Sequence, residues 1–454
     1  MNWRTGFHWL SVGLLLTCFQ IGSFPGGALA AEVEEEKPKG VRPENVYAEI
    51  DDQYVELIQL FADTLDQVDR NYVKDVDRRE LMEAAIRGVI SKLDPYSNYI
   101  APDELDRFKT GVESEFGGIG IQIGLRNEQL IVTSPMIDTP AFRAGILAGD
   151  RITHINGEPT KGFSLEEAIK RLKGPIGTEV DVTIYHPADF SSEEINLRRE
   201  NIQIETIIGD QRLEDGTWDF LLDHESKLGY IRMTAFSRMT AGQLRSVIER
   251  LLDQEMEGLV LDLRSNPGGL LGSAVEVCDM FIDSGKIVST EGRNSPKRSW
   301  SASSQGTLPE FPMAVLIDGF SASASEIVSA CLQDHDRAVV IGQRSWGKGS
   351  VQNIVELEAG KSALKLTTAD YQRPSGKKIH RYEKDTEKDD WGVSPSDGFE
   401  VKLSRDQLIA YSRYRRARDM QSLNPSPPAP ETDLTEIDPT LTKALEYLRE
   451  EISQ

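Results

Sequence analysis

The alternation of strand-like and helix-like segments between residues 228 and 405 constrains the fold most strongly. Buried strands are predicted at 228–233, 259–263, 314–317 and 338–341, and amphipathic helices at 240–254, 271–282 and 324–333. This order is typical of an α/β layered domain with a parallel sheet. The polar, Ser-rich stretch 292–312 interrupts the alternation and is predicted to be a surface insertion.

The regions on either side have other patterns. Residues 45–111 carry apolar residues at helical spacing and are predicted to be a helical region, with a third, short helix after Pro102. Residues 112–200 alternate over short segments between glycine turns, which predicts a mainly-β module. The α/β domain is assigned to 201–405, and 406–454 is predicted to be a linker followed by one helix.

The N-terminus has the pattern of a secretory signal peptide. Arg4 precedes a short apolar run, and Ala28-Leu29-Ala30 forms an A-x-A cleavage site. We expect residues 1–30 to be removed, a disordered leader at 31–44, and export to the periplasm or cell envelope. An uncleaved anchor, which would bring membrane association, and a lipoprotein attached at Cys18 are the alternatives.

Charge and composition exclude several classes of function. The chain has 51 basic and 74 acidic residues and a formal net charge of −23, which repels nucleic acid and anionic lipid headgroups. No His or Cys pair has the spacing of metal ligands, so neither a metal nor another cofactor is expected. Cys278 and Cys331 lie in helical patterns and are expected to be buried thiols.

Two short motifs in the α/β region favour other chemistries only weakly. Residues 342–348 nearly spell a phosphate-binding loop, but Gly349 stands where a Ser or Thr is needed for magnesium, and a strand-like pattern follows. Residues 345–348 match the S-x-x-K of penicillin-recognising enzymes, yet glycines flank them and the K-T-G at 109–111 lies in the wrong order.

Two turns at strand ends carry the stronger signal. Residues 321–326, Ser-Ala-Ser-Ala-Ser-Glu, join a buried strand to an apolar helix. Such a turn exposes a hydroxyl and directs backbone N–H groups at a substrate oxygen, although an N-capping turn is its commoner role. The Gly-rich turn 264–269 follows a neighbouring strand, and its N–H groups are suited to complete an oxyanion hole at the same sheet edge.

Several motifs resemble the C-terminal processing proteases, also called tail-specific proteases. They are VLDLRSNPGGLL at 260–271, SASASEIVSACLQD at 321–334, GKGSVQ at 347–352, LDPYSNY at 93–99, GGIGI at 117–121 and LKLTTADYQRPSG at 364–376. The resemblance implies a crotonase-like α/β protease core, an inserted PDZ domain at 112–200 and N-terminal helices packed on the core. It also implies that Ser323 is the nucleophile, Lys348 the general base and Gln352 the residue that orients this base.

Two departures from the family pattern leave these three positions intact. Ser345-Trp346 stands where Thr-Phe is usual, and Ser396 follows Pro395 where the family usually has Asp. An inactive relative of the proteases is therefore not expected.

The chemistry of the residues agrees with this assignment. No histidine has a recognisable triad setting, so a serine nucleophile needs another base. A lysine serves only when its pKa falls from about 10.4 toward 7–8, which desolvation brings about, so Lys348 is expected in a largely apolar pocket. Gln352 accepts from the amine without adding charge. The oxyanion is expected to be held by N–H groups of Ala324 and Gly268, with Gly269 nearly equivalent to Gly268.

The PDZ-like module has its own candidate site. Backbone N–H groups of a Gly-x-Gly-x loop capture the terminal carboxylate of a peptide, which then adds as a strand. The loop residues are Gly118, Ile119, Gly120 and Ile121. A helix at 164–172 is predicted to flank the groove, with Ile169 and Leu172 as candidate contacts.

Together these features predict an exported serine endopeptidase that recognises protein C-termini and cleaves through a Ser–Lys dyad. Its partners are protein or peptide substrates, and an activating adaptor is left open. The first alternative is a catalytically silent PDZ scaffold, against which the intact Ser323, Lys348 and Gln352 argue. The second is a trypsin-fold protease with PDZ modules, whose G-N-S-G-G motif and His–Asp–Ser order are absent.

Overall fold

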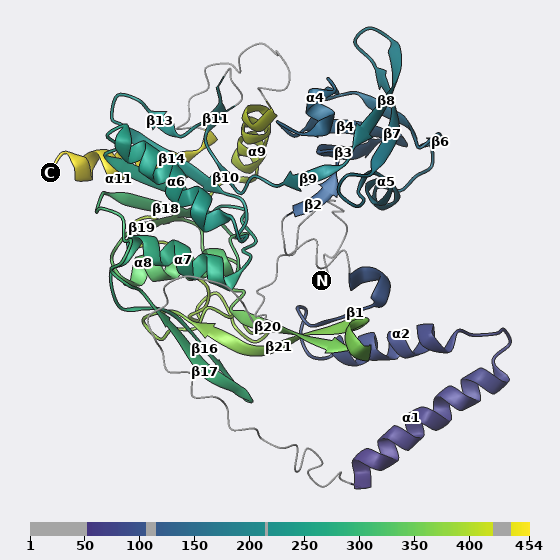
Figure 1. Cartoon of the computed structure of the whole chain (residues 1–454). Coiled ribbons are helices and arrows are strands. Elements are labelled where there is room, and N and C mark those ends of the chain that lie inside the picture. The colour runs from purple at the N-terminus through teal and green to yellow at the C-terminus, as the bar shows by residue number, and fades with distance from the viewer. Residues whose placement is uncertain (1–51, 106–114, 214–216, 421–436) are drawn as a thin grey trace. The chain divides into compact units, whose positions relative to one another are not determined.

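The computed structural model describes residues 52–105, 115–213, 217–420 and 437–454 (Figure 1). The described residues form two compact units, one of which consists of 52–102 and 354–366, while the other holds the rest. The predicted signal peptide, leader and proline-rich linker lie outside the described residues. Within the described ranges, no helix has both the length and the apolar character needed to cross a membrane.

The α/β domain is built on a mostly parallel sheet, as the alternation predicts. Its strands follow the order β10 (Ile207–Ile208), β14 (Leu228–Met233), β15 (Gly258–Asp262), β18 (Met313–Ile317) and β19 (Val339–Gly342), with β13 (Leu221–Asp223) also on β14. The strands from β14 to β19 run parallel, and β10 and β13 are antiparallel to β14. Every residue of β15 and β18 is buried, as in a sheet covered on both faces.

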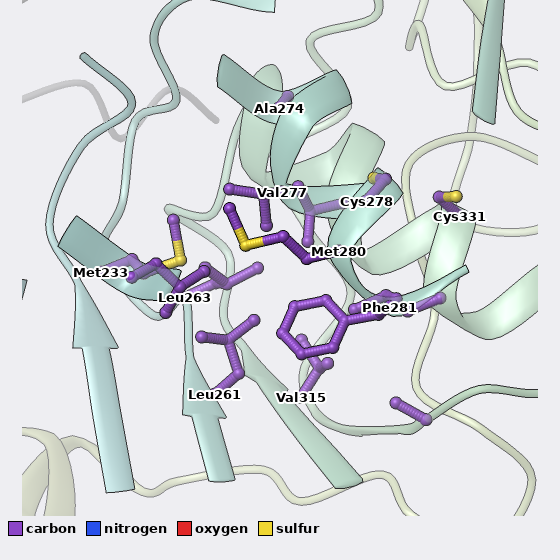
Figure 2. Packing of buried hydrophobic residues seen from close by; sticks show 14 of the residues in the cluster. Met233, Leu261, Leu263, Ala274, Val277, Cys278, Met280, Phe281, Val315 and Cys331 are labelled. Atoms are coloured by element: carbon purple, nitrogen blue, oxygen red, sulfur yellow. The ribbon is translucent and has the colours of Figure 1, made fainter. Parts of the chain in front are cut away.

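Helices cover the two faces of this sheet. The helices α6 (Thr240–Asp253), α7 (Leu271–Phe281) and α8 (Ala324–Asp334) each end within one residue of the prediction. Leu261 and Val315 point into the core beneath these helices, where Phe281 packs against them (Figure 2). Val260 and Leu316 alternate with them and point to the opposite face, into a second core that α11 (Pro439–Ile452) completes.

Cys278 of α7 and Cys331 of α8 are both free and buried, as predicted (Figure 2). Burial is the main reason that the pKa of the Cys278 thiol lies well above its ordinary value. Both cysteines belong to the buried core beneath the helices.

The C-terminal region contains a helix that the prediction of a linker and one helix lacks. The helix α9 (Arg405–Met420) precedes the residues 421–436 that lie outside the described ranges. The sequence of α9 lacks a continuous apolar stripe because part of its buried face consists of charged side chains in ion pairs. Arg415 donates to Asp210 at 2.7 Å, and both side chains are less than a tenth exposed. The prediction of a linker was therefore wrong for residues 405–420, whereas the predicted C-terminal helix is present as α11 (Pro439–Ile452).

The stretch 292–312 lies at the surface, but its first part is an ordered strand and not an irregular insertion. The strand β17 (Ser295–Ser301) pairs antiparallel with β16 (Lys286–Gly292), which in turn pairs with the end of β21 (Ser362–Gln372). Most residues of β17 are exposed, which explains its polar composition.

The smaller unit contains a strand in addition to the predicted helices. It holds α1 (Asp52–Asn71), α2 (Arg78–Ile90) and β1 (Asn98–Ile100), which pairs antiparallel with residues 363–365 of β21. Asp77 caps α2 by accepting from the backbone N–H groups of Arg79 and Glu80. The end of β20 (Ser350–Leu357) and a 3-10 turn at Glu358–Gly360 complete the unit. Of the predicted third helix, only residues 102–105 are described.

The mainly-β module forms as predicted. Its sheet has the order β3 (Ile121–Arg126), β4 (Gln129–Pro135), β5 (Arg151–Ile155), β7 (Glu179–His186) and β8 (Ser191–Arg198), with β6 (Glu158–Pro159) on β5. A separate pair joins β2 (Glu115–Gly118) to β9 (Glu200–Gln203). Two helices, α4 (Pro140–Arg143) and α5 (Leu165–Leu172), pack with this sheet around one core. A small pair, β11 (Gln211–Arg212) with β12 (Trp218–Asp219), leads into the α/β domain.

Candidate active site

The turn before α8 holds Ser323 in a constrained conformation. Ser323 is the N-cap of α8, with φ 57° and ψ −113°, and its side chain and backbone are 2% exposed. A residue with a Cβ held at such backbone angles costs on the order of 1–3 kcal/mol, and such conformations cluster at functional sites. The surrounding contacts therefore fix this serine at the end of β18, as the small-residue turn predicts.

The glycine-rich turn 264–269 packs directly on the Ser323 turn. The backbone carbonyl of Asn266 accepts from the N–H of Ala322 and from the hydroxyl of Ser325, both at 3.0 Å. Gly268 has φ +96°, and a Cβ placed there would lie 2.6 Å from the carbonyl oxygen of Ala322. The same atom would lie 2.8 Å from the Cβ of Ser323. The two strand-end turns thus meet at one edge of the sheet, as predicted.

A single buried carboxylate joins the Ser323 turn to the Lys348 loop. One oxygen of Glu326 accepts from the N–H groups of Ser323 and Lys348, both at 2.8 Å. Its other oxygen accepts from the Ser345 hydroxyl at 2.5 Å and the Gly347 N–H at 2.7 Å. Glu326 is fully buried, and Lys348 is only 5% exposed. These bonds fix the backbone of the candidate base relative to that of the candidate nucleophile.

The sequence interpretation gave Glu326 no role. The spacing of Ser323 and Glu326 is that of a capping box, in which the N3 glutamate reaches back to the N-cap backbone N–H. The sequence motif contains this capping signal. It does not reveal the bonds from Glu326 to the Lys348 loop, because only the tertiary structure brings that loop close to Glu326.

The ionisation of Glu326 makes the stability of the protein depend on pH. Burial raises the pKa of the Glu326 carboxyl from 4.5 to about 7, although its four donors lower it. The unfolded chain therefore loses this proton at lower pH than the native protein does. The contribution of Glu326 to the free energy of unfolding is full below pH 4.5 and is lost as the pH rises through 7, by about 3 kcal/mol.

Urea unfolding of the wild type and of Glu326→Gln between pH 5 and pH 8 measures this effect. The free energy of unfolding of the wild type, minus that of the variant, should fall over this range. A difference that stays constant or rises would show that the carboxyl is already ionised at pH 5.

Gln352 lies in β20, buried near the same loop. Its amide nitrogen donates to the carbonyl and hydroxyl oxygens of Ser350, at 3.1 and 2.8 Å, and lies 3.4 Å from the Thr367 hydroxyl. These contacts fix which way the amide points. Its carbonyl oxygen is thereby kept for another donor, which is the role the resemblance assigns to it.

The predicted oxyanion donors differ in how they are engaged. The N–H of Gly268 donates to the side-chain oxygen of Asn266 at 2.8 Å, so this predicted donor already has an acceptor. Ala324 is the first residue of α8, and its N–H has no intrahelical acceptor. Gly269 follows at φ 156° and bridges to Phe236. Both glycines therefore stay candidates for the second oxyanion donor, and Gly268 must give up its bond to Asn266 to serve.

In the mainly-β module, the predicted carboxylate loop lies between β2 and β3. The 117–123 segment is not one continuous strand, because Gly120 turns at φ +76°. The carbonyls of Ile119 and Gly120 accept from the N–H groups of Ala141 and Met136, at 2.9 and 2.8 Å. Thr139 also donates its hydroxyl to Gly120. Within the part of the chain that the structure describes, the N–H groups of Ile119 and Gly120 have no recorded acceptor.

The remaining residues of this candidate groove are placed as follows. Gly118 ends β2 and Ile121 begins β3. Ile169 of α5 is half-buried and stays a candidate contact. Leu172 is only 5% exposed and belongs to the core of the module, so it is not a surface contact.

The two departures from the family pattern have clear contacts. Ser345 supplies the hydroxyl that donates to Glu326, the same group that a threonine would offer. Ser396 accepts from the backbone N–H of Val340 at 3.0 Å and so joins its loop to β19. In the residues described, no three His, Cys, Asp or Glu side chains are arranged to hold a metal ion.

Three family models match the chain in succession. Residues 21–104 match the activating protease CtpB N-terminal domain, 131–185 match a PDZ domain and 227–391 match peptidase family S41. The fold and these matches define a PDZ-containing peptidase with an S41 protease domain.

The sequence relatives identify the family more closely. The chain is 35% identical over 411 residues to the carboxy-terminal-processing protease of Bartonella bacilliformis, covering 87% of this chain and 88% of that protein. It is also 35% identical over 313 residues to a probable CtpA-like serine protease of Staphylococcus aureus, covering 68% of this chain and 60% of that protein. The chain belongs to the family of carboxy-terminal-processing proteases, and the resemblance drawn from its motifs is confirmed.

Solved structures are similar as well. One is a photosystem II D1 C-terminal processing protease, 28% identical, with a TM-score of 0.43, covering 76% of this chain and 92% of that chain. Another is the peptide-bound PDZ domain of a carboxy-terminal protease from Vibrio cholerae, 25% identical, with a TM-score of 0.19. It covers 20% of this chain and 99% of that chain. Family membership rests on the sequence relatives.

Proposed function

We propose that this protein is an exported serine endopeptidase that binds protein C-termini through its PDZ domain and cleaves through a Ser323–Lys348 dyad. The observation that carries this proposal is the Glu326 carboxylate, which binds the backbone N–H groups of both residues at 2.8 Å. Because this carboxyl group is fully buried and also binds Ser345 and Gly347, it fixes the backbones of the two residues relative to each other.

The proposed reaction is an acyl transfer followed by hydrolysis. The Ser323 hydroxyl attacks the scissile carbonyl and gives its proton to the Lys348 amine, which passes that proton to the leaving amine. Water then attacks the acyl group and gives a proton to Lys348. The ester bond to Ser323 breaks, Lys348 returns the proton to the Ser323 oxygen, and the new C-terminus leaves. The burial of Lys348 favours the neutral amine that this base requires.

Two neighbouring groups support the reaction. The N–H of Ala324 at the start of α8, together with the N–H of Gly268 or of Gly269, is proposed to bind the oxyanion. For Gly268 this requires that its N–H leaves the Asn266 side chain. Gln352, whose amide nitrogen is held by Ser350, is proposed to accept from the Lys348 amine through its carbonyl oxygen.

The substrate is proposed to bind first through its C-terminus. In the loop 118–121, the carbonyls of Ile119 and Gly120 are held by α4 and the turn before it, which leaves their N–H groups for an anion. A free carboxylate there would form charge-assisted hydrogen bonds, and the peptide would extend beside β3.

Amidation of the substrate C-terminus tests this recognition. Binding to full-length Ser323→Ala, which leaves the ligand intact, should weaken by about 1.5–3 kcal/mol when the terminal carboxylate becomes an amide. Titration calorimetry with the free-acid and amidated forms of one peptide measures the difference. Equal affinities would refute C-terminal recognition and leave the proposed cleavage chemistry untouched.

Export is proposed from the N-terminal sequence alone. Arg4, the apolar run and the A-x-A site at 28–30 are the features of a cleaved signal peptide, with a mature chain that begins at Ala31. The periplasm or cell envelope is the compartment that such a signal implies.

A further inference from the structure

A buried charge cluster lies beneath the glycine-rich turn of the active site. The Arg264 guanidinium donates to the carboxylate of Asp262 at 2.6 Å and to both oxygens of Asp438, at 2.7 and 2.9 Å. Arg264 is 6% exposed and the two aspartates are 1% exposed or less. The hydroxyl of Tyr230 also donates to Asp262, at 2.7 Å, and the Tyr411 ring lies 4.6 Å from the guanidinium carbon.

The members of this cluster come from distant parts of the chain. Asp262 ends β15, and Arg264 begins the turn 264–269 that packs on Ser323. Asp438 is the N-cap of α11, 174 residues further on and beyond the segment that matches the S41 family model. One carboxylate that binds the guanidinium therefore comes from the strand, and the other comes from the C-terminal helix.

We propose that Asp438 is a positioning residue for catalysis, which acts through Arg264 to hold the turn 264–269 against the nucleophile. This inference rests on the proposed Ser–Lys chemistry. A guanidinium with five N–H donors is held in one orientation by two carboxylates on its two sides. Without the second carboxylate, a buried N–H loses its acceptor, and Arg264 and the turn that follows it move to find another.

Asp438→Asn tests this role without removing the helix cap. The Asp438 carboxylate also accepts from the N–H of Leu441, and asparagine caps helices about as well as aspartate. The variant therefore keeps α11 in place but turns an N–H₂ group toward Arg264. We expect kcat to fall at least tenfold, with KM within about twofold of the wild-type value.

Arg449→Gln is the matched control on the same helix. Arg449 pairs with Asp223 at 2.8 Å and joins α11 to the domain, but its side chain is 51% exposed and does not contact Arg264. This variant should keep the wild-type kcat. If both variants lower kcat alike, or if Asp438→Asn lowers only the melting temperature, Asp438 merely anchors the helix and the proposal is overturned.

Amide hydrogen exchange gives a readout that does not depend on cleavage. Residues 263–270 should exchange faster in Asp438→Asn than in the wild type or in Arg449→Gln. Unchanged exchange there overturns the coupling. Faster exchange in Asp438→Asn, together with a wild type that cleaves no peptide bond, would sustain the coupling and reject the proposed function. Asp438→Ser, which caps the helix but is too short to reach Arg264, provides the same comparison if the asparagine variant does not fold.

Discussion

Replacing Lys348 with arginine should stop peptide-bond cleavage as completely as replacing it with alanine. A guanidinium stays protonated at every pH at which the protein is folded, so it cannot accept the Ser323 proton. The loss in kcat should be on the order of 10⁴-fold or more. Steady-state cleavage of a disordered polypeptide by the folded variants, with folding checked by circular dichroism, measures it.

The combined variant adds a second expectation. Ser323→Ala with Lys348→Ala should be no less active than either single variant, because residues that act as one catalytic unit do not contribute additively. Lys378→Arg is the matched control, since Lys378 forms a partly exposed pair with Asp385 and lies over the Tyr382 ring, and arginine can make both contacts. Near-wild-type activity of Lys348→Arg would mean that Lys348 is not the base.

Replacing Gly268 with alanine should lower kcat by roughly 10²–10³-fold, the size of effect seen when an oxyanion donor is lost. The added Cβ would lie 2.6 Å from the Ala322 carbonyl and 2.8 Å from the Ala324 nitrogen, and these are backbone atoms that cannot rotate away. The backbone angle of φ +96° adds strain. The turn must therefore move away from the nucleophile.

Gly272→Ala is the matched control for this substitution. Gly272 lies four residues further on, in α7, and a Cβ there meets nothing within 4 Å. Alanine also has the better helix propensity, so this variant should keep its activity and its stability. Comparable activity of the two alanine variants would contradict the close packing of the two turns.

The sequence predicted the α/β domain well because its strands are buried on both faces. Residues 314–317 are a continuous apolar run, 259–263 are apolar except for Asp262, and the helices between them carry one apolar face. Tertiary packing and local pattern agree there, so the predicted ends differ from the observed ones by only one or two residues.

Other features could not be predicted for physical reasons. The helix α9 is held partly by Arg415 and its ion pair with Asp210, a partner more than 200 residues away. The strand β17 is exposed and polar, so it lacks the alternation of a half-buried strand. In the site, Glu326 and Asp438 bind partners that are distant in sequence. The bond from the Gly268 N–H to the Asn266 side chain depends on the backbone conformation of the turn, which the sequence does not reveal.

The central claim, that Ser323 is the nucleophile of a protease, is tested most directly by mass spectrometry of the products from one disordered substrate. The substrate is incubated separately with the wild type and with Ser323→Ala, each with and without a chelator. We expect new, shortened fragments only with the wild type, and in equal amounts in both buffers. Fragments produced by Ser323→Ala at the wild-type rate, or cleavage that stops with the chelator, would contradict the Ser–Lys mechanism.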